Sequence, residues 1–248
     1  MKNVRLVLMY EGTRYFGFAE QADVPTVSGE IKRSLKSLLQ EEVSIIGASR
    51  TDRGVHALGQ VVNFMTGSKI RTESFSGALN FYLPGDIRVL KAEEVPDDFH
   101  SRFMARGKEY CYSIFMGGQI PFNLRRFAYH SHRDLEIERM RDAAARLVGE
   151  HDFSSFAQEI IGRPIRRISS IEITEKPAIM GRFLEFRFIG NGFLYKMIRA
   201  IMGTLIETGL NKRTPDEVEE ILKARDRKRA GVTAPAHGLC LVGVNYGK

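Results

Sequence analysis

The hydrophobic pattern of residues 4–95 switches repeatedly between two periods, and the order of these switches constrains the fold more than any other feature of the chain. Apolar side chains alternate where a strand is expected and recur every three or four residues where a helix is expected. The pattern predicts a strand at 4–10, a helix at 31–39, strands at 43–48 and 60–65, a helix at 75–82 and a strand at 87–95. This is the element order of a ferredoxin-like fold.

A similar order begins again in the second part of the chain, although the sequence itself does not repeat. The pattern predicts a strand at 108–115, a helix opened by Asp134, strands at 165–174 and 183–189, helices at 193–208 and from Thr214, and a strand at 239–246. Thr214 begins a capping box, completed by Glu217, with proline at the first helical position. That combination is typical of a helix start.

These elements predict an α+β fold of two ferredoxin-like halves, residues 1–105 and 106–248, with mainly antiparallel sheets. A chain of 248 residues is long enough for two small domains. No low-complexity linker separates the halves, which indicates that they pack around a central cleft.

The charge balance is basic, with 37 Lys and Arg against 30 Asp and Glu and a formal net charge of +7. Such a surplus favours a polyanionic partner such as nucleic acid, although basic proteins without one are common. The two cysteines form no disulfide framework, which favours a reducing, cytoplasmic compartment. We expect no signal peptide and no membrane span, because the strand pattern starts at once and no apolar run is long enough.

The segment 48–57 contains the strongest candidate for a catalytic side chain. Asp52 lies between Arg50 and Arg53 and is followed by Gly54, on a short polar loop between two apolar strands. The two guanidinium groups stabilise the ionised carboxylate, and the glycine allows a turn that presents it at the surface. The alternative is a turn whose charges simply face water.

Arg199 is the second candidate, because it interrupts a helical segment otherwise suited to a core. A buried charge is costly unless it is paired, and a carboxylate from the other half is the natural partner. The alternative is an arginine at the edge of the buried face with its head group in solvent.

Tyr110 is the third candidate, on an alternating strand that follows Arg106 and carries Lys108. An aromatic ring beside basic residues can stack on a nucleobase, whereas an ordinary strand simply buries such a ring.

Other patterns point away from metal and nucleotide chemistry. His130 and His132 have no Cys or acid at ligand spacing, so we expect no metal site. The chain has no Gly-rich phosphate loop, which disfavours ATP and NAD, and no serine in a nucleophile elbow.

Seven segments carry a resemblance to a known family over essentially the whole chain. In order they are Tyr10-Glu11-Gly12-Thr13-x-Tyr15-x-Gly17-Phe18; 49–57; Ala78-Leu79-Asn80 with Leu83-Pro84-x-Asp86-Ile87-Arg88-Val89; Phe99-His100-Ser101-Arg102-Phe103 leading to Lys108-x-Tyr110-x-Tyr112; Gly149-x-His151-Asp152-Phe153; Gly192-Phe193-Leu194-x-x-Met197-Ile198-Arg199; and 226–239. With these segments in this order, the chain resembles the TruA-type tRNA pseudouridine synthases.

The resemblance implies roles for three residues: Asp52 as the catalytic aspartate, Tyr110 as the residue that packs on the target base, and Arg199 as the partner of Asp52. The chain departs from the family pattern at two places. Many members have Ala where this chain has Arg53, and many have Gly-Trp-Gln where it has Gly17-Phe18-Ala19. Arg53 adds a charge beside the predicted site, which could alter substrate preference.

The resemblance also implies a reaction and its partners. Uridine becomes pseudouridine in the tRNA anticodon arm, at positions 38 to 40, in a homodimer and without a cofactor. The target base must leave its stack, and a basic surface holds phosphates in the RNA cleft. Arg50, Arg53, Arg102 and Arg106 are the candidates for these phosphate contacts. The rival hypotheses are an inactive RNA-binding module of the same fold and an enzyme acting on small nucleotides.

Overall fold

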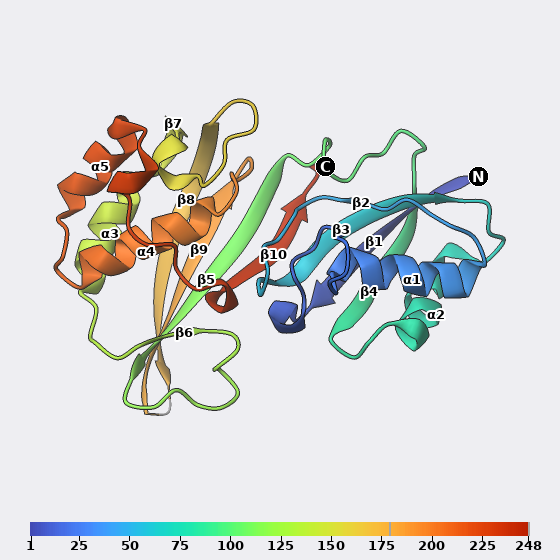
Figure 1. Cartoon of the computed structure of the whole chain (residues 1–248), viewed down its shortest axis with the longest axis horizontal. Helices are drawn as coiled ribbons and strands as arrows, with labels where there is room; N and C mark the ends of the chain where they lie inside the picture. Colours follow the sequence, from blue (N-terminus) through green and yellow to red (C-terminus); the bar gives the residue numbers. More distant parts are fainter. Residues whose placement is uncertain (179, 248) are drawn as a thin grey trace. The chain divides into compact units, whose positions relative to one another are not determined.

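The computed structural model describes residues 1–178 and 180–247, which form two compact units (Figure 1). Of these residues, unit 1 comprises 1–106 and 240–247, and unit 2 comprises 107–178 and 180–239. The predicted halves place the C-terminal strand in the second half, but it clusters with unit 1 from Cys240 onward. The reason is that β10 (Leu239–Asn245) pairs in parallel with the start of β3 (His56–Thr66).

Unit 1 has the element order that the hydrophobic pattern predicts. It contains β1 (Lys2–Tyr10), α1 (Val27–Leu39), β2 (Ile46–Gly47), β3, α2 (Phe75–Tyr82) and β4 (Ile87–Val95). Strands β1, β3 and β4 pair antiparallel in the order β4-β1-β3, and β2 pairs antiparallel with β3. This is the ferredoxin-like strand order, with β10 as an additional strand on β3.

The core of unit 1 lies between this sheet and its helices. Val4, Leu6 and Leu8 are fully buried because they alternate on one face of β1. The rings of Phe64 and Phe75 meet with centroids 5.9 Å apart, and burying each such side chain stabilises the fold by about 1.5–3 kcal/mol. The predicted strand at 43–48 is only two residues long in the structure.

Unit 2 consists of an antiparallel sheet, three α-helices and one added short strand. Its elements are β5 (Gly107–Gly117), β6 (Tyr129–Ser131), α3 (Ile137–Ala145), β7 (Gly149–Asp152), β8 (Ile165–Ala178), β9 (Gly181–Gly190), α4 (Met197–Gly209) and α5 (Pro215–Ala224). The strand order is β5-β9-β8-β7, antiparallel throughout, and β6 pairs in parallel with β5. Both units therefore have the α+β character and the mainly antiparallel sheets that the sequence predicts.

Two predicted helix starts in unit 2 are displaced. Asp134 does not cap α3; Glu136 precedes that helix, and Asp134 forms an ion pair with Arg182 at 3.0 Å. Helix α4 starts at Met197 rather than at 193, because Lys196 adopts a left-handed backbone conformation with φ of 58°. The capping box of α5 is confirmed: Thr214 Oγ1 accepts from the Glu217 N–H, and the Glu217 carboxylate accepts from the Thr214 N–H at 2.6 Å.

Candidate active site

The loop that carries Asp52 connects β2 to β3 and is anchored by a buried amide. Gln60 of β3 is fully buried, and its side-chain oxygen accepts from the Ser49 N–H at 3.2 Å. Its Nε2 donates to the Ser49 carbonyl at 2.8 Å. One side chain thus satisfies both backbone groups of Ser49, and it fixes where the loop leaves the sheet.

Thr51 anchors the loop one residue before the carboxylate. Its hydroxyl lies 2.7 Å from the Tyr10 hydroxyl in a buried hydrogen bond, and its carbonyl accepts from the Phe18 N–H at 3.0 Å. After it, the Asp52 carbonyl accepts from the Val55 N–H at 3.1 Å, across a turn in which Gly54 has φ of 78°. Thr51 and Val55 are buried, whereas Asp52 between them is half-buried. These hydrogen bonds therefore hold the backbone of the half-buried Asp52 in a defined turn.

The first motif, residues 10–18, packs against this loop. The Gly12 N–H donates to His56 Nδ1 at 3.1 Å, and a Cβ on Gly12 would lie 2.0 Å from the Val55 carbonyl oxygen. Gly17 has φ of 107°, and its Cβ would lie 2.9 Å from the Thr51 carbonyl oxygen. Only glycine allows so close an approach of two backbones at these positions.

The motif at 83–89 leads into β4, and its residue Asp86 contacts the 10–18 segment. The Asp86 carboxylate accepts from the Tyr15 hydroxyl at 2.5 Å and pairs with Arg14 at 3.2 Å, and its carbonyl accepts from the Glu11 N–H at 2.9 Å. Burial and the Asp86 carboxylate raise the pKa of Tyr15 well above its usual range, so Tyr15 stays a hydrogen-bond donor. Three motifs that are distant in sequence therefore form one scaffold in unit 1.

The four candidate RNA-binding arginines are all exposed and all belong to unit 1. Arg50 and Arg53 share the loop with Asp52, and the Arg53 guanidinium lies over the Phe16 ring, 4.1 Å from its centroid. Arg102 and Arg106 lie on the segment that follows β4, at a different place in the sequence from the loop. Phe16 was not singled out from the sequence, because an aromatic residue in a loop gives no periodic signal.

The segment that carries Arg102 is itself fixed to the sheet of unit 1. The Ser101 N–H donates to Asn63 Oδ1 at 2.9 Å, and the Ser101 hydroxyl donates to the Ile46 carbonyl at 2.6 Å. The Tyr246 hydroxyl donates to the Ser101 carbonyl at 2.7 Å. Arg102 therefore projects from an ordered base, as a positioned phosphate contact requires.

In unit 2, Tyr110 lies on β5 and is 8% exposed. Its ring meets the edge of Phe193 with centroids 5.4 Å apart. Tyr112, on the same face of the strand, is fully buried and donates its hydroxyl to the Pro235 carbonyl at 3.0 Å. Burial raises the pKa of Tyr112 above its usual range, although the nearby Arg199 charge opposes the shift.

Arg199 is half-buried near the start of α4, and its orientation is set by the loop that follows α5. Its Nε donates to the Ala234 carbonyl at 2.8 Å, and the Ala234 N–H donates to the Arg199 carbonyl at 2.9 Å. The guanidinium is therefore held by a backbone loop, as a positioned cation requires. Its pairing with Asp52 stays a prediction.

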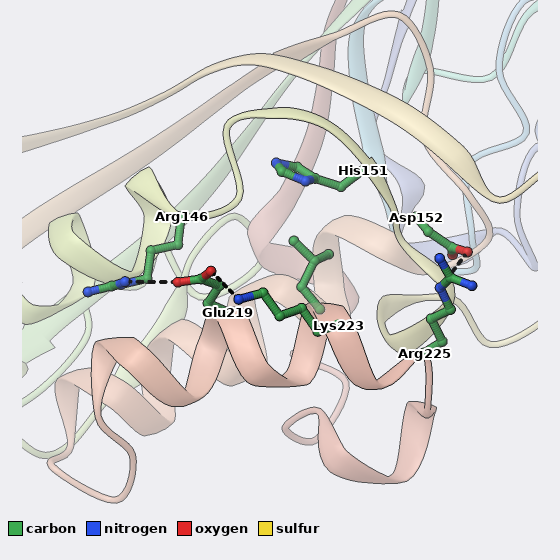
Figure 2. A pocket seen from close by; sticks show the side chains of 7 residues that line it. Arg146, His151, Asp152, Glu219, Lys223 and Arg225 are labelled. Carbon is green, nitrogen blue, oxygen red and sulfur yellow. Dashed lines mark hydrogen bonds and ion pairs between the residues drawn. The ribbon is translucent and has the colours of Figure 1, made fainter.

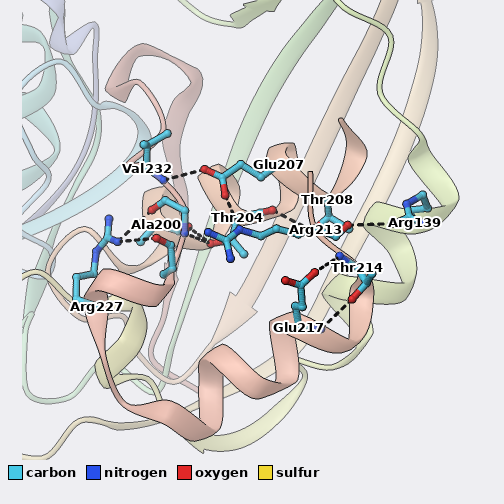
Figure 3. Close-up of polar contacts among 12 residues, drawn as sticks. Arg139, Ala200, Thr204, Glu207, Thr208, Arg213, Thr214, Glu217, Arg227 and Val232 are labelled. Carbon is cyan, nitrogen blue, oxygen red and sulfur yellow. Dashed lines mark hydrogen bonds and ion pairs between the residues drawn. The ribbon is translucent and has the colours of Figure 1, made fainter. Parts of the chain in front are cut away.

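That loop, residues 230–234, packs tightly on α4 (Figure 3). The Gly231 N–H donates to Thr204 Oγ1 at 2.9 Å, and a Cβ on Gly203 would lie 1.6 Å from the Val232 carbonyl oxygen. Arg227 stabilises the conformation of this loop: it donates to the Gly231 carbonyl at 3.0 Å and to Thr233 Oγ1 at 2.9 Å. The last motif, 226–239, thus provides the support on which Arg199 depends.

Unit 2 also has a pocket of about 340 Å³ between β7 and α5 (Figure 2). Its charged side chains are mutually paired: Glu219 binds Arg146 at 3.2 Å and Lys223 at 2.5 Å, and Asp152 binds Arg225 at 3.1 Å. Burial would raise the pKa of Asp152, but hydrogen bonds from Ser154 and the Arg225 charge outweigh it and hold the pKa below its usual range. The Asp152–Arg225 pair links β7 to the end of α5, and the Glu219–Arg146 pair links α5 to the end of α3.

The described part of the chain gives two further findings. No group of three or more His, Cys, Asp or Glu side chains among residues 1–178 and 180–247 could hold a metal ion. Within the same residues, every helix is too short or too polar to cross a bilayer.

Comparison with known proteins identifies one family. The family model described as tRNA pseudouridine synthase matches residues 6–104 and 143–247. The tRNA pseudouridine synthase A of Acetivibrio thermocellus is 45% identical, and the match covers 99% of this chain and 100% of the relative. The proteins of the same name from Thermoanaerobacter pseudethanolicus and Caldicellulosiruptor bescii are 43% and 42% identical, with 99% of this chain and 100% of each relative covered.

Proposed function

The chain belongs to the tRNA pseudouridine synthase family, and from this premise we propose that it isomerises uridine to pseudouridine at positions 38 to 40 of the tRNA anticodon arm. The observation that carries the proposal is the loop at 49–55, which holds the half-buried Asp52 carboxylate between two exposed arginines. A rigid turn that presents one carboxylate among cations suits chemistry on an RNA strand.

Asp52 is the catalytic residue in this proposal. The reaction breaks the bond from N1 of the base to the sugar and forms a bond from C5 to the same sugar carbon, so the substrate and product are isomers. A carboxylate can start it by attacking the sugar or the base, or by taking a sugar proton. Each route needs Asp52 ionised and held still, and the hydrogen bonds of Thr51 and Val55 keep its backbone in place.

Arg199 and Tyr110 complete the proposed site from unit 2. The Arg199 guanidinium, oriented by Ala234, would pair with Asp52 and hold the carboxylate in its reacting position. The Tyr110 ring, braced by Phe193, would pack on the uracil once the base has left its stack. Arg50, Arg53, Arg102 and Arg106 would hold the RNA backbone through their exposed guanidinium groups.

We propose further that the reaction needs no cofactor and that the chain acts in the cytoplasm as a homodimer. The isomerisation transfers no electrons to or from an outside partner, so its chemistry demands no redox group. The thiols of Cys111 and Cys240 suit a reducing compartment. Light scattering on the purified protein tests the dimer, and a monomeric mass at all concentrations would contradict it.

The test of the function is an incubation of the purified protein with unmodified tRNA and no added cofactor. Pseudouridine is expected at positions 38 to 40 with the wild-type protein. Asp52→Asn and Asp52→Ala should fold normally and yield none, because Asn keeps the shape of the side chain but loses the nucleophile and base. Binding of tRNA without product by the wild type would favour an inactive RNA-binding module instead.

A further inference from the structure

The residue next to Asp52 is held by an aromatic ring. The Arg53 guanidinium carbon lies 4.1 Å from the centroid of the Phe16 ring, close enough for a stacked cation–π contact. Phe16 remains 37% exposed and Arg53 is exposed, so the pair lies at the surface, one residue after Asp52 in the sequence.

The backbone on both sides of this pair is rigid. The Phe16 N–H donates to the Pro25 carbonyl at 2.9 Å, and the Phe16 carbonyl accepts from Gln21 at 2.8 Å. Two residues later, the Phe18 N–H donates to the Thr51 carbonyl at 3.0 Å. The chain segments that carry the ring and the guanidinium are thus fastened to each other by backbone hydrogen bonds within unit 1.

The stack leaves Arg53 able to bind an anion. Among residues 1–178 and 180–247 no carboxylate forms an ion pair with Arg53, unlike Arg14, which pairs with Asp86. The ring lies against the guanidinium carbon, and a planar guanidinium carries its N–H donors around its edge. A planar guanidinium binds a phosphate through two parallel N–H···O bonds, and a ring that fixes its orientation lowers the entropic cost of doing so.

We propose that Phe16 positions Arg53 as a bidentate clamp for one phosphate of the substrate RNA, next to the nucleotide presented to Asp52. The inference rests on the proposed function and adds to it a positioning residue and a defined contact. Because many family members carry Ala where this chain has Arg53, the clamp gives this chain an affinity for the RNA backbone that such relatives must obtain elsewhere.

The test is a double-mutant cycle on tRNA affinity, measured with unmodified tRNA between 50 and 200 mM salt. Arg53→Ala should weaken Kd about tenfold and reduce the slope of log Kd against log salt by about 0.7–0.9, as expected for one lost phosphate contact. Phe16→Leu should weaken Kd about threefold at an almost unchanged slope, because the charge remains. Phe16→Tyr, which keeps a ring, should restore most of the loss.

The cycle separates positioning from a purely structural role. If Phe16 acts through Arg53, Phe16→Leu adds nothing to the loss in Kd once Arg53 is Ala. Additive losses would overturn the inference, as would an unchanged slope in Arg53→Ala. Arg71→Ala is the control, because Arg71 is an exposed arginine beyond the far end of β3. A wild type that forms no pseudouridine would refute the proposed function; an active wild type with an additive cycle refutes only the clamp.

Discussion

Arg199 is the residue on which the proposed catalytic pair depends most directly. Arg199→Ala removes both the charge and the planar pair of N–H donors that would hold the Asp52 carboxylate, whereas Arg199→Lys keeps the charge alone. We expect turnover to fall in the order wild type, Lys, Ala, with a smaller change in tRNA affinity than in rate. Single-turnover rates and Kd on the same tRNA measure both effects, and a normal rate for Arg199→Ala would contradict the proposed pair.

Tyr10 anchors the Asp52 loop through the hydroxyl of Thr51, the residue before Asp52. Tyr10→Phe removes the 2.7 Å hydrogen bond to the buried Thr51 hydroxyl, and we expect a loss of about 1–2 kcal/mol in unfolding free energy. Turnover should fall further than tRNA affinity, because Thr51 is adjacent to Asp52. Chemical denaturation and single-turnover assays test this. Tyr82→Phe, at an exposed tyrosine on α2, is the control, and equal effects of the two substitutions would contradict the argument.

At the scale of elements, the contact between the 10–18 segment and the Asp52 loop depends on Gly17. Gly17→Ala forces a side chain onto a backbone with φ of 107° and brings a Cβ within 2.9 Å of the Thr51 carbonyl oxygen. We expect a cost of about 1–3 kcal/mol and a marked loss of turnover, because the loop must move. Thermal unfolding measures the loss of stability, and a turnover assay measures the loss of activity.

The control for this substitution is Gly67→Ala, since a Cβ at Gly67 meets nothing within 4 Å. Gly67→Ala should leave the unfolding midpoint and the turnover near their wild-type values. A Gly17→Ala protein that behaves like this control would show that the loop does not need the close approach.

Elements with a strong local signal could be predicted from the sequence. The alternation of Val4, Leu6 and Leu8 predicts β1, and the capping box at Thr214 predicts the start of α5. Strands β6 and β7 are too short to show a period, and nothing local indicates that Lys196 would adopt a left-handed conformation. The parallel pairing of β10 with β3 joins residues far apart in sequence, which a local pattern does not encode.

The candidate site also contains residues that the sequence could indicate and residues that it could not. Asp52 could be singled out because an acid between two arginines before a glycine is unusual on a short loop. The residues that contact this loop could not be singled out, because Gln60 is one polar residue in a strand and Phe16 is one aromatic residue in a loop. Their roles depend on the backbone contacts that bring residues 16–18 beside Thr51.

For the whole molecule, the net charge of +7 and the exposed arginines predict how tRNA affinity depends on salt. If the four candidate arginines each contact one phosphate, Kd should weaken roughly 50- to 150-fold between 50 and 200 mM salt, because bound counterions are released. Filter binding or fluorescence anisotropy across this range tests it. A flat response would mean that binding does not depend on contacts between these arginines and phosphates.

The parallel pairing of β10 with β3 has a consequence for the order in which the protein is made. Cys240 and Leu241 lie beside His56 and Ala57, immediately after the Asp52 loop, and a Cβ on Gly59 would lie 2.4 Å from the Val242 carbonyl oxygen. The ribosome must therefore synthesise residues 107–239, which takes on the order of ten seconds, before this edge of β3 can be covered. Residues 107–239 of unit 2 can therefore start to fold before unit 1 receives its added strand β10.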